Sequence, residues 1–575
     1  MSLAEARARV ARVTAERSRR FRASGAWRGA SLGELFLGTC ATRPGAVVLV
    51  DGDVPLDFAS LRERVLRLAG GLETLGVGPG DAVAYQLPNW WEAAAACLAT
   101  WTIGAVAVPI VPILREREVA FILGEIRPRV FFVPGRHRGV DYAAQAESAS
   151  RGRANPPRIV VVRGEATGSG PSEIDASASA DDGAARTTLA EILAASPARS
   201  SVRSPDTLAL VMYTSGSTAA PKGALHSHDT LAAEVRSLVD AHGLGSADRT
   251  LMPSPLTHVS GLIHGILCPA ILGTSAVLME RWDAGVALGA IERHRVTYLA
   301  GAPTFLQDLL AHPDVARRDL ASLRLYSCGG ASVPPDLIRQ ARERIPAMVA
   351  KRSYGSSEFP TIATTTAADA ILRGLDTEGR ALAGVEIRIT DEAGRALGAG
   401  AEGEIRARGP ECFLGYTDRA LDAESFDDDG FYRTGDLGTL DADGYLRVTG
   451  RVKDIIVRKG EKISAREVED LLARFPGVAE VAVVPLADAA TGERACACVR
   501  MEAGATPVDL GGIVAFLRAH GLTPQKLPEQ LERVDDFPRT PSGKIHKRFL
   551  RERIEAAGRA VTAARVDAAP RERKE

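Results

Sequence analysis

Short apolar runs alternate with amphipathic segments along residues 30–135 of the chain. Apolar runs of about four to eight residues bounded by turn residues are typical of buried strands, whereas apolar residues three and four apart indicate a helix. We expect strands at 46–50, 82–87 and 105–111, and helices at 58–75 and 90–102. Because strands that alternate with helices pair in parallel, this rhythm predicts a parallel sheet covered by helices, in a protein of the α/β class.

The stretch 213–223, with the sequence YTSGSTAAPKG, follows an apolar run at 208–212 that predicts another buried strand. Apolar residues at helical spacing follow it, so the expected order is strand, loop, helix. A loop of glycine and hydroxyl residues with one lysine, Lys222, offers backbone N–H groups, hydroxyl donors and a cation to a polyphosphate. It is not a GxxxxGK[ST] loop, because Pro221 precedes the lysine and Gly223 follows it. The alternative interpretation is a solvated turn, since the same residues are common in loops.

The length of 575 residues predicts two or more domains. Short strands separated by turns begin near residue 385 and predict a smaller β-rich subdomain. Ser464 and Glu467 form a capping-box pattern at the start of a helix in a compact α+β unit. The expected divisions are a helical extension at 1–29, a large domain at 30–452 with a solvated insertion at 144–188, a small domain at 453–555, and a charged tail at 556–575.

Composition excludes several classes of function. A formal net charge of −1 gives no electrostatic case for binding nucleic acid or an anionic membrane. No run approaches about 18 apolar residues, so no membrane span is expected. The seven cysteines show no metal-site or disulfide spacing, which favours a reducing, cytoplasmic location. Cys496 and Cys498 are expected to face the same side of a strand as small core residues.

Further candidate residues lie at turns that follow expected strands. Gly330 permits a flat ligand to approach the backbone, and Glu358, after the glycine turn of RSYGSSE, is a candidate ligand for a hard cation. Asp436 is a candidate for bonding ribose hydroxyls, with Arg451 as a ribose or phosphate partner. His258 is a candidate for a functional role, with a core position as the alternative. Together with Lys544 in an exposed Pro/Gly-rich loop, these residues suit a nucleoside triphosphate attacked at its α-phosphate.

Five ordered motifs carry a resemblance to a known family: YTSGSTAAPKG, YGSSE, YRTGD, GRVKDIIVRKGEKI and PRTPSGKIHK. In this order and at these separations they resemble the signatures of the acyl-adenylate-forming (AMP-binding) superfamily, over roughly residues 30–550. The resemblance implies a large N-terminal domain with a β-barrel-like subdomain, and a small, mobile C-terminal lid that swings about a hinge at Lys453. It also implies a reaction in two steps. A carboxylate attacks MgATP to give acyl-AMP and pyrophosphate, and a thiol then takes the acyl group.

The resemblance assigns a role to each matched position. Lys544 contacts the carboxylate and phosphate oxygens during adenylation, and Glu358, with Thr214, holds Mg²⁺. The remaining positions are implied as binding residues: for the β- and γ-phosphates Thr214, Ser215, Gly216, Ser217, Thr218 and Lys222; for the adenine Gly330, Ala331 and Tyr354, with Gly355 and Ser357 in the same motif; for the ribose Asp436 and Arg451; for the pantetheine tunnel Lys459 and Gly460.

Two positions depart from the family pattern. Ala219 replaces a usual glycine of the phosphate loop, and Ser357 replaces a usual threonine. Alanine disfavours φ > 0, so we expect slower or weaker use of ATP if that glycine adopts a left-handed conformation.

The sequence around these motifs predicts which thiol accepts the acyl group and which class of acid is activated. No carrier-protein domain follows the last motif, so free coenzyme A is the expected acceptor. The stretch 86–123 resembles ligases for cyclohexanecarboxylate and short- to medium-chain acids, and the expected pocket segments are apolar, which suits an aliphatic or alicyclic acid. One alternative is an aryl-acid or amino-acid activating enzyme that loads a separate carrier protein. The other is a weakly active sensor of acyl groups or nucleotides. The sequence leaves open whether the chain is a monomer or a homodimer.

Overall fold

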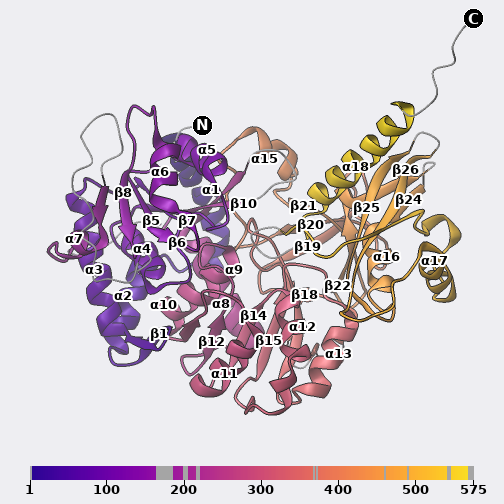
Figure 1. Cartoon of the computed structure of the whole chain (residues 1–575). Coiled ribbons are helices and arrows are strands. Elements are labelled where there is room, and N and C mark those ends of the chain that lie inside the picture. Colours follow the sequence, from indigo (N-terminus) through magenta and orange to yellow (C-terminus); the bar gives the residue numbers. More distant parts are fainter. Residues whose placement is uncertain are drawn as a thin grey trace, which may run out of the picture. The chain divides into compact units, whose positions relative to one another are not determined.

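The computed structural model describes residues 3–163, 186–198, 205–214, 221–366, 369–370, 373–458, 461–488, 491–539 and 545–567 (Figure 1). The chain divides into two compact units. Unit 1 comprises Met1–Ile387, Arg406–Arg433 and Gly444–Leu446, and unit 2 comprises Arg388–Ile405, Thr434–Asp443 and Arg447–Glu575. The two units are described separately below.

A seven-stranded sheet forms the first half of unit 1. All neighbouring strands pair in parallel except the first two of the order given next, β11 and β10, which form an antiparallel pair. The strand order is β11 (Lys222–Ser227), β10 (Leu208–Thr214), β4 (Val106–Pro109), β3 (Ala82–Tyr85), β5 (Val130–Pro134), β8 (Arg158–Val162) and β9 (Arg186–Thr188). The predicted parallel sheet is therefore confirmed.

A second sheet follows in unit 1, and its central strands are also parallel. Its order is β18 (Gly379–Ala381), β17 (Ala363–Thr364), β16 (Val349–Tyr354), β15 (Leu325–Gly329), β14 (Tyr298–Gly301), β12 (Arg249–Met252), β13 (Ser275–Leu278), β1 (Val47–Asp51) and β2 (Val54–Asp57). The parallel strands make the carboxyl ends of β14, β15 and β16 neighbours, which positions residues that follow these strands at one edge.

The expected β-rich region after residue 385 is confirmed as β19 (Glu386–Thr390), β20 (Gly403–Arg408), β21 (Tyr432–Leu440) and β22 (Tyr445–Arg451). These strands are neighbours in that order, and β22 pairs with β18 at Arg380 and Tyr445. Across the described residues they belong to an open sheet and close no barrel, because each end of the strand order is an edge.

Apolar residues on both faces of the two sheets explain the layers of unit 1. Along β3, Ala82 and Ala84 belong to one buried cluster, whereas Val83 and Tyr85 belong to another, as the strand period of two requires. The outer cluster is covered by α1 (Leu3–Ala23), α5 (Glu116–Ile126) and α6 (Tyr142–Ser150). The cluster between the sheets holds α2 (Leu32–Thr42), α3 (Phe58–Thr74), α4 (Trp91–Thr102), α8 (His228–His242), α9 (Val259–Leu262), η1 (Ile263–Leu267) and α10 (Cys268–Leu272). The far face of the second sheet packs on α11 (Ala284–His294), α12 (Pro303–Ala311) and α13 (Pro335–Arg344).

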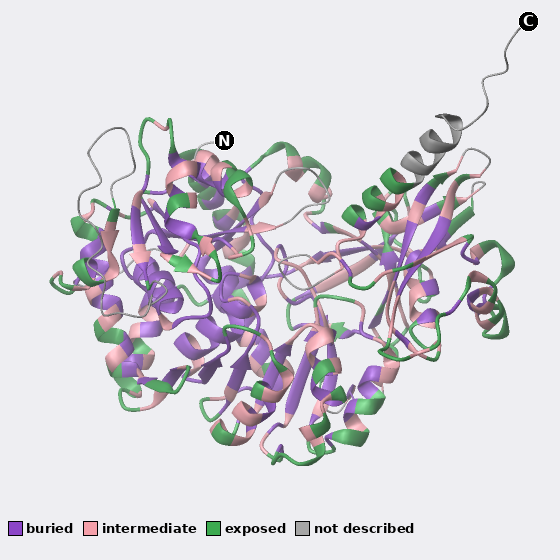
Figure 2. Cartoon of the chain, viewed as in Figure 1, coloured by how far each residue is buried: buried purple, intermediate pink, exposed green. Residues whose placement is uncertain are grey.

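Figure 2 shows that the strands of both sheets are largely buried, while exposed residues gather on the outer helices. None of the helices within the described chain combines the length and apolar character needed to cross a bilayer.

Unit 2 holds a separate sheet with helices on both faces. Its strands are β24 (Glu461–Ser464), β23 (Ile455–Arg458), β26 (Gly492–Met501) and β25 (Val478–Asp488), with β27 (Gln530–Arg533) beside β26. One face packs on α16 (Ala465–Leu472) and α17 (Leu510–Ala519), and the other on α18 (Lys547–Asp567). Cys496 and Cys498 are buried together on the α18 face, so their predicted core position is confirmed.

Three expectations about local structure need correction. Strand β11 intervenes between the loop and α8, so the expected order of strand, loop and helix was wrong. Residues 142–150 form α6 inside the expected insertion, of which 164–185 lies outside the described residues. The β-barrel-like subdomain that the resemblance implied was also wrong, because β19 to β22 belong to an open sheet within the described residues.

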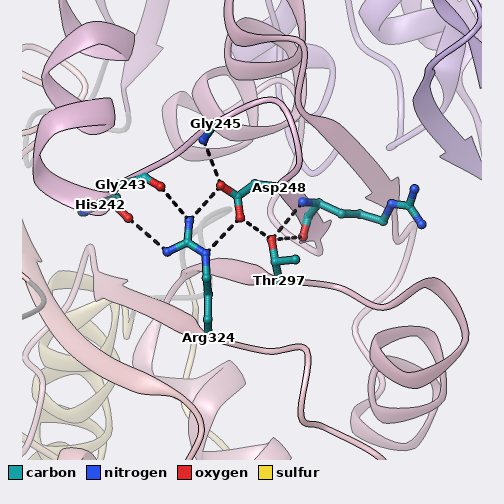
Figure 3. A network of polar contacts seen from close by, with 7 residues as sticks. His242, Gly243, Gly245, Asp248, Thr297 and Arg324 are labelled. Carbon is teal, nitrogen blue, oxygen red and sulfur yellow. Dashed lines mark hydrogen bonds and ion pairs between the residues drawn. The ribbon is translucent and has the colours of Figure 1, made fainter.

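A polar network joins the end of α8 to the second sheet (Figure 3). Arg324 donates to both carboxylate oxygens of Asp248, at 3.0 and 2.8 Å, and to the carbonyls of His242 and Gly243, at 3.2 and 3.0 Å. Burial opposes the charge on Asp248, but the hydrogen bonds from Arg324 and Thr297 hold the pKa of this carboxyl below its usual value. The arginine thus pairs a buried charge and satisfies carbonyls that α8 leaves open at its C-terminus.

Two buried glutamates, one on this helix and one bonded to it, have hydroxyl partners instead. Glu234 accepts a hydrogen bond from Thr361 at 2.7 Å, and Glu411 accepts one from Ser237 at 2.5 Å. Burial raises the pKa of Glu234 to about 8, and the neighbouring charge of Glu411 adds to the shift. Burial also raises the pKa of Glu411 to about 7. At least one of these carboxyls is therefore protonated near neutral pH.

Candidate active site

Some of the predicted site residues lie within the described part of the chain, and the others lie outside it. Thr214 and Lys222 lie at the two ends of the predicted phosphate loop. The predictions for Ser215, Gly216, Ser217, Thr218 and Ala219, for Lys459 and Gly460, and for Lys544 fall outside the described residues.

Strands β10 and β11 bring the two ends of the phosphate loop together. Thr214 is the register partner of Lys222, and its hydroxyl lies 3.5 Å from the lysine carbonyl oxygen. The pairing explains the local sequence, because β10 is an apolar run and Gly223 lies where a Cβ would come within 2.8 Å of Thr417. The loop therefore joins two paired strands and does not lead into a helix N-terminus.

Lys222 and Glu358 approach the same buried tyrosine, Tyr416. The lysine ammonium lies 5.5 Å from the centre of the Tyr416 ring, within the range of a cation–π interaction. The tyrosine hydroxyl donates to Oε1 of Glu358 at 2.7 Å. Burial and then the charge of Glu358 raise the pKa of Tyr416 well above its usual value, so the hydroxyl keeps its proton. One tyrosine thus contacts both a lysine and a carboxylate.

The turn that carries Glu358 is fixed by its own backbone. A Cβ at Gly355 would lie 2.0 Å from the carbonyl oxygen of Pro360, so only glycine fits there. His226 on β11 lies 2.9 Å from the Ser357 carbonyl oxygen. Burial lowers the pKa of His226 to about 4, so the ring is neutral and donates through Nε2. The turn is tied in this way to the strand that begins with Lys222.

Glycine also governs the end of β15, where an adenine site is predicted. A Cβ at Gly329 would lie 2.6 Å from the carbonyl oxygen of Ser353 on β16, and Gly330 has φ +80°. Ala331 follows in an exposed position, and Tyr354 ends the neighbouring strand β16. The close contact of backbone lies at Gly329, and Gly330 and Ala331 follow β15 beside the end of the parallel strand β16. An adenine site at these residues stays a prediction.

Unit 2 contains the residues predicted to hold the ribose. Arg451 Nε lies 2.6 Å from Oδ1 of Asp436, with side-chain exposures of 62% for the arginine and 12% for the aspartate. Thr434 accepts from the Asp436 amide at 3.1 Å and donates to the Ile405 carbonyl at 2.7 Å, which fixes the backbone of the aspartate. Lys453 lies exposed in the short 3₁₀ turn after Arg451.

His258 and His264, which lie between β12 and β13, differ in their burial and contacts. His258 is half-buried and caps α9, where its Nδ1 accepts from the Ser260 amide at 3.4 Å. His264 is buried, with its ring 5.8 Å from the ring of Tyr298, and burial lowers its pKa to about 4. A core role fits His264, whereas the functional role of His258 stays a prediction.

A magnesium ion would fit the Glu358 position. The carboxylate is 8% exposed, and one of its oxygens is bonded to Tyr416. The described residues contain no cluster of three or more metal-ligating side chains. Mg²⁺ is commonly held by one or two carboxylates with the remaining positions taken by substrate phosphates and water, so a single glutamate beside a phosphate loop suits this ion.

Comparison with known families identifies the chain. Residues 36–417 match the family described as AMP-binding enzyme, and residues 467–544 match the AMP-binding enzyme C-terminal domain. This chain belongs to the AMP-binding enzyme family. The resemblance read from the five motifs and the prediction of an enzyme are both confirmed.

Two relatives cover nearly the whole of this AMP-binding enzyme. It is 34% identical over 546 residues to the medium-chain fatty-acid–CoA ligase of Escherichia coli (strain K12), with 94% of this chain and 93% of that protein covered. It is 33% identical over 513 residues to a feruloyl-CoA synthase of Amycolatopsis sp, with 89% and 96% covered. The relatives thus include proteins named for aliphatic and for aromatic acids.

Solved structures support the fold. ATP-bound MatB from Rhodopseudomonas palustris has a TM-score of 0.78 at 28% identity, with 90% of this chain and 98% of that chain covered. The amide bond synthetase McbA from Marinactinospora thermotolerans has a TM-score of 0.78 at 32% identity, with 91% and 99% covered. The expected fold, with a large N-terminal and a small C-terminal domain, is confirmed.

Tyr416 is the site residue that the motifs missed. It stands in the stretch FLGYTD, residues 413–418, which lies outside the five motifs. Its position became evident only from the pairing of β11 with this stretch, where Ala224 bridges to Tyr416.

Proposed function

We propose that this enzyme is an ATP-dependent carboxylate–CoA ligase that acts on aliphatic or alicyclic acids. The observation that carries the proposal is the joining of Lys222 and Glu358 through Tyr416, at the closed base of the phosphate loop. A lysine and a carboxylate in one place suit the phosphates of a nucleotide and the divalent cation that accompanies them.

The reaction would proceed in two steps. A carboxylate oxygen of the acid attacks the α-phosphorus of ATP, and the bond to the bridging oxygen breaks, which releases pyrophosphate. The thiol of coenzyme A then loses its proton and attacks the acyl carbon, and AMP leaves. Because both reactants of the first step are anionic, cations near the developing charge lower the barrier.

The residues of the chain would divide this work. Lys222 and the hydroxyls of 214–218 bind the β- and γ-phosphates, and Glu358 with Thr214 holds Mg²⁺, which supplies charge neutralisation when bound. Asp436 and Arg451 bind the ribose, and Gly330, Ala331 and Tyr354 border the adenine. Lys544 stabilises the charge at the reacting oxygens, Lys453 serves as the hinge, and Lys459 and Gly460 line the path of the pantetheine.

The acid class is proposed from the segment after β14. Gly301 carries no side chain, and a Cβ there would meet the Phe305 ring at 2.8 Å. Phe305 in turn packs on Trp282, with ring centres 4.6 Å apart. Phe305 thus fills the space beside Gly301, and an apolar aromatic pair in this segment suits an uncharged acyl chain or ring. The medium-chain fatty-acid–CoA ligase among the relatives supports the same class.

Pyrophosphate release across a panel of carboxylic acids, with and without coenzyme A, tests the proposal. We expect release that needs an aliphatic or alicyclic acid and turns over only with coenzyme A. Lys544→Ala should lower the rate by about 10²–10³-fold. The matched control is Lys526→Ala, which removes another lysine of unit 2, one paired with Glu467, and should keep the rate.

Other outcomes would redirect the assignment. Turnover with aryl acids only would replace the acid class and keep the ligase. Release without any turnover by coenzyme A would favour loading of a carrier protein. Absence of release with every acid would refute the ligase and favour a sensor.

A further inference from the structure

The segment 410–417, which carries Tyr416, lies between the candidate site and the N-terminal helix α1. Its backbone amides bond on the site side. Leu414 and Thr417 donate to the β11 carbonyls of Leu225 and Gly223 at 2.8 and 2.7 Å, and Phe413 donates to the Glu358 carbonyl at 2.8 Å. The segment is therefore attached directly to both the lysine strand and the glutamate turn.

The carbonyls of the same segment bond to side chains of the N-terminal region. Arg17 donates to two of them, those of Cys412 and Phe413, at 3.1 and 3.0 Å. Trp27 donates from its indole nitrogen to the Pro410 carbonyl at 3.0 Å. Because no strand of the described chain pairs with these carbonyls, the N-terminal side chains supply their hydrogen-bond donors.

Arg9 makes the contact nearest to the site. Its guanidinium donates to the Tyr416 carbonyl and, at 2.7 Å, to Oδ2 of Asp422, whose other oxygen accepts from the Tyr416 amide at 2.8 Å. The Arg9 side chain is only 7% exposed. Both backbone groups of Tyr416 are thus held by one partly buried ion pair. Two guanidinium nitrogens, one bonded to the Asp422 carboxylate and one to the Tyr416 carbonyl, fix the direction as well as the position.

We infer that Arg9 is a positioning residue for the nucleotide site, acting through Asp422 and Tyr416 on Glu358 and Lys222. The inference rests on the proposed function for the identity of the bound nucleotide. A displacement of Tyr416 moves the hydroxyl that orients Glu358 and the ring on which Lys222 lies. Small displacements of groups that bind reacting or bridging charges lower rates strongly. The first helix, which contributes no phosphate, metal or ribose ligand, thereby sets the affinity for MgATP.

A purely structural role predicts something different. It would lower the melting temperature of the Arg9 variant without changing nucleotide affinity in the folded fraction. A positioning role changes the Kd for MgATP, the KM for ATP and the Mg²⁺ concentration needed for half-maximal rate, while the KM for the acid stays constant.

The test uses the full chain and MgATP as the probe. Binding of MgATP is measured by calorimetry below the melting temperature of each variant, and pyrophosphate release is measured in parallel. For Arg9→Ala we expect about a tenfold rise in Kd and in the KM for ATP. Arg9→Lys should recover part of the loss, because lysine keeps the charge but cannot bridge two acceptors in one plane. The matched control is Arg20→Ala, which removes an exposed ion pair of the same helix with Glu386 and should behave as wild type.

Each outcome decides the inference. A lower melting temperature with unchanged MgATP affinity would overturn it. If Arg9→Ala does not fold, Asp422→Asn carries the same test, because it keeps an acceptor for Tyr416 and removes the charge that pairs with Arg9. If the wild type binds MgATP but releases no pyrophosphate, the proposed function fails and the calorimetric comparison still decides the role of Arg9. Failure of the wild type to bind MgATP would overturn both.

Discussion

The residues proposed to bind the phosphates and those proposed to bind the ribose differ in their burial and in their partners. On the phosphate side, Glu358 is buried and bonded to Tyr416. The backbone of Tyr416 is itself held by the ion pair of Arg9 and Asp422. On the ribose side, Asp436 is paired with an arginine that is 62% exposed. The first arrangement is set before any ligand arrives, whereas the second contains a side chain in solvent.

The difference shows which binding residues are held in position before a ligand binds. Exposed ion pairs contribute little and rearrange readily, whereas a buried carboxylate with fixed partners keeps its direction. Charge stabilisation during the reaction gains most from groups that need no reorganisation. We therefore expect changes on the phosphate side to lower both the rate and the affinity for MgATP, and changes on the ribose side mainly to weaken binding.

Replacing the buried carboxylate should have the largest effect. Glu358→Gln keeps the shape and removes the charge that would hold Mg²⁺, so kcat/KM for pyrophosphate release should fall by about 10²–10³-fold. The half-saturating Mg²⁺ concentration should rise as well. Glu386→Gln, at a partly exposed glutamate paired with Arg408, serves as the control and should keep the wild-type rate. Equal rates for the two variants would contradict the metal role.

The ribose aspartate should have an intermediate effect, mainly on KM. Asp436→Asn should raise the KM for ATP by about tenfold with little change in kcat, because charge-assisted hydrogen bonds to hydroxyls are lost in ground state and transition state alike. 2′-Deoxy-ATP provides the control. The wild type should lose affinity for it, and the variant should distinguish it less from ATP. A variant that discriminates as well as the wild type would show that Asp436 does not read the sugar.

The tyrosine hydroxyl should have the smallest effect. Tyr416→Phe keeps the ring under Lys222 and removes one hydrogen bond to Glu358, a loss of about 1 kcal/mol that corresponds to about a fivefold fall in kcat/KM. Tyr445→Phe, which removes a similar bond to Asp369, is the matched control. A fall as large as that of Glu358→Gln would mean that the hydroxyl itself meets the substrate.

Much of this architecture could be read from the sequence. The parallel sheet followed from the alternation of apolar strands and helices, and α16 begins at Ser464 as its cap predicted, with the side chain accepting from the Glu467 amide. These features depend on residues close in sequence. Glu358 and Lys222 could be named for the same reason, since each stands in a motif with its own local chemistry.

Features that depend on distant residues could not be read in this way. Tyr416 lies 58 residues from Glu358 in sequence, and Arg9 lies 407 residues from Tyr416. Strand β11 was missed because its residues, KGALHS, lack the alternation or apolar run that marks a strand; its pairing with β10 and with the segment at Tyr416 stabilises it.

The two buried glutamates Glu234, on α8, and Glu411 couple the folding of this enzyme to the binding of protons. The pKa of Glu234 is raised to about 8 and that of Glu411 to about 7, whereas both return to the ordinary range near 4.5 when the chain unfolds. Between these limits the native protein retains protons on the two carboxyls that the unfolded chain gives up, so the contribution of this pair to stability is greatest in mild acid and declines as pH rises toward 8. The heat absorbed on melting will consequently include the ionisation of the surrounding buffer, and phosphate and Tris solutions at the same pH will yield different enthalpies for one and the same unfolding event.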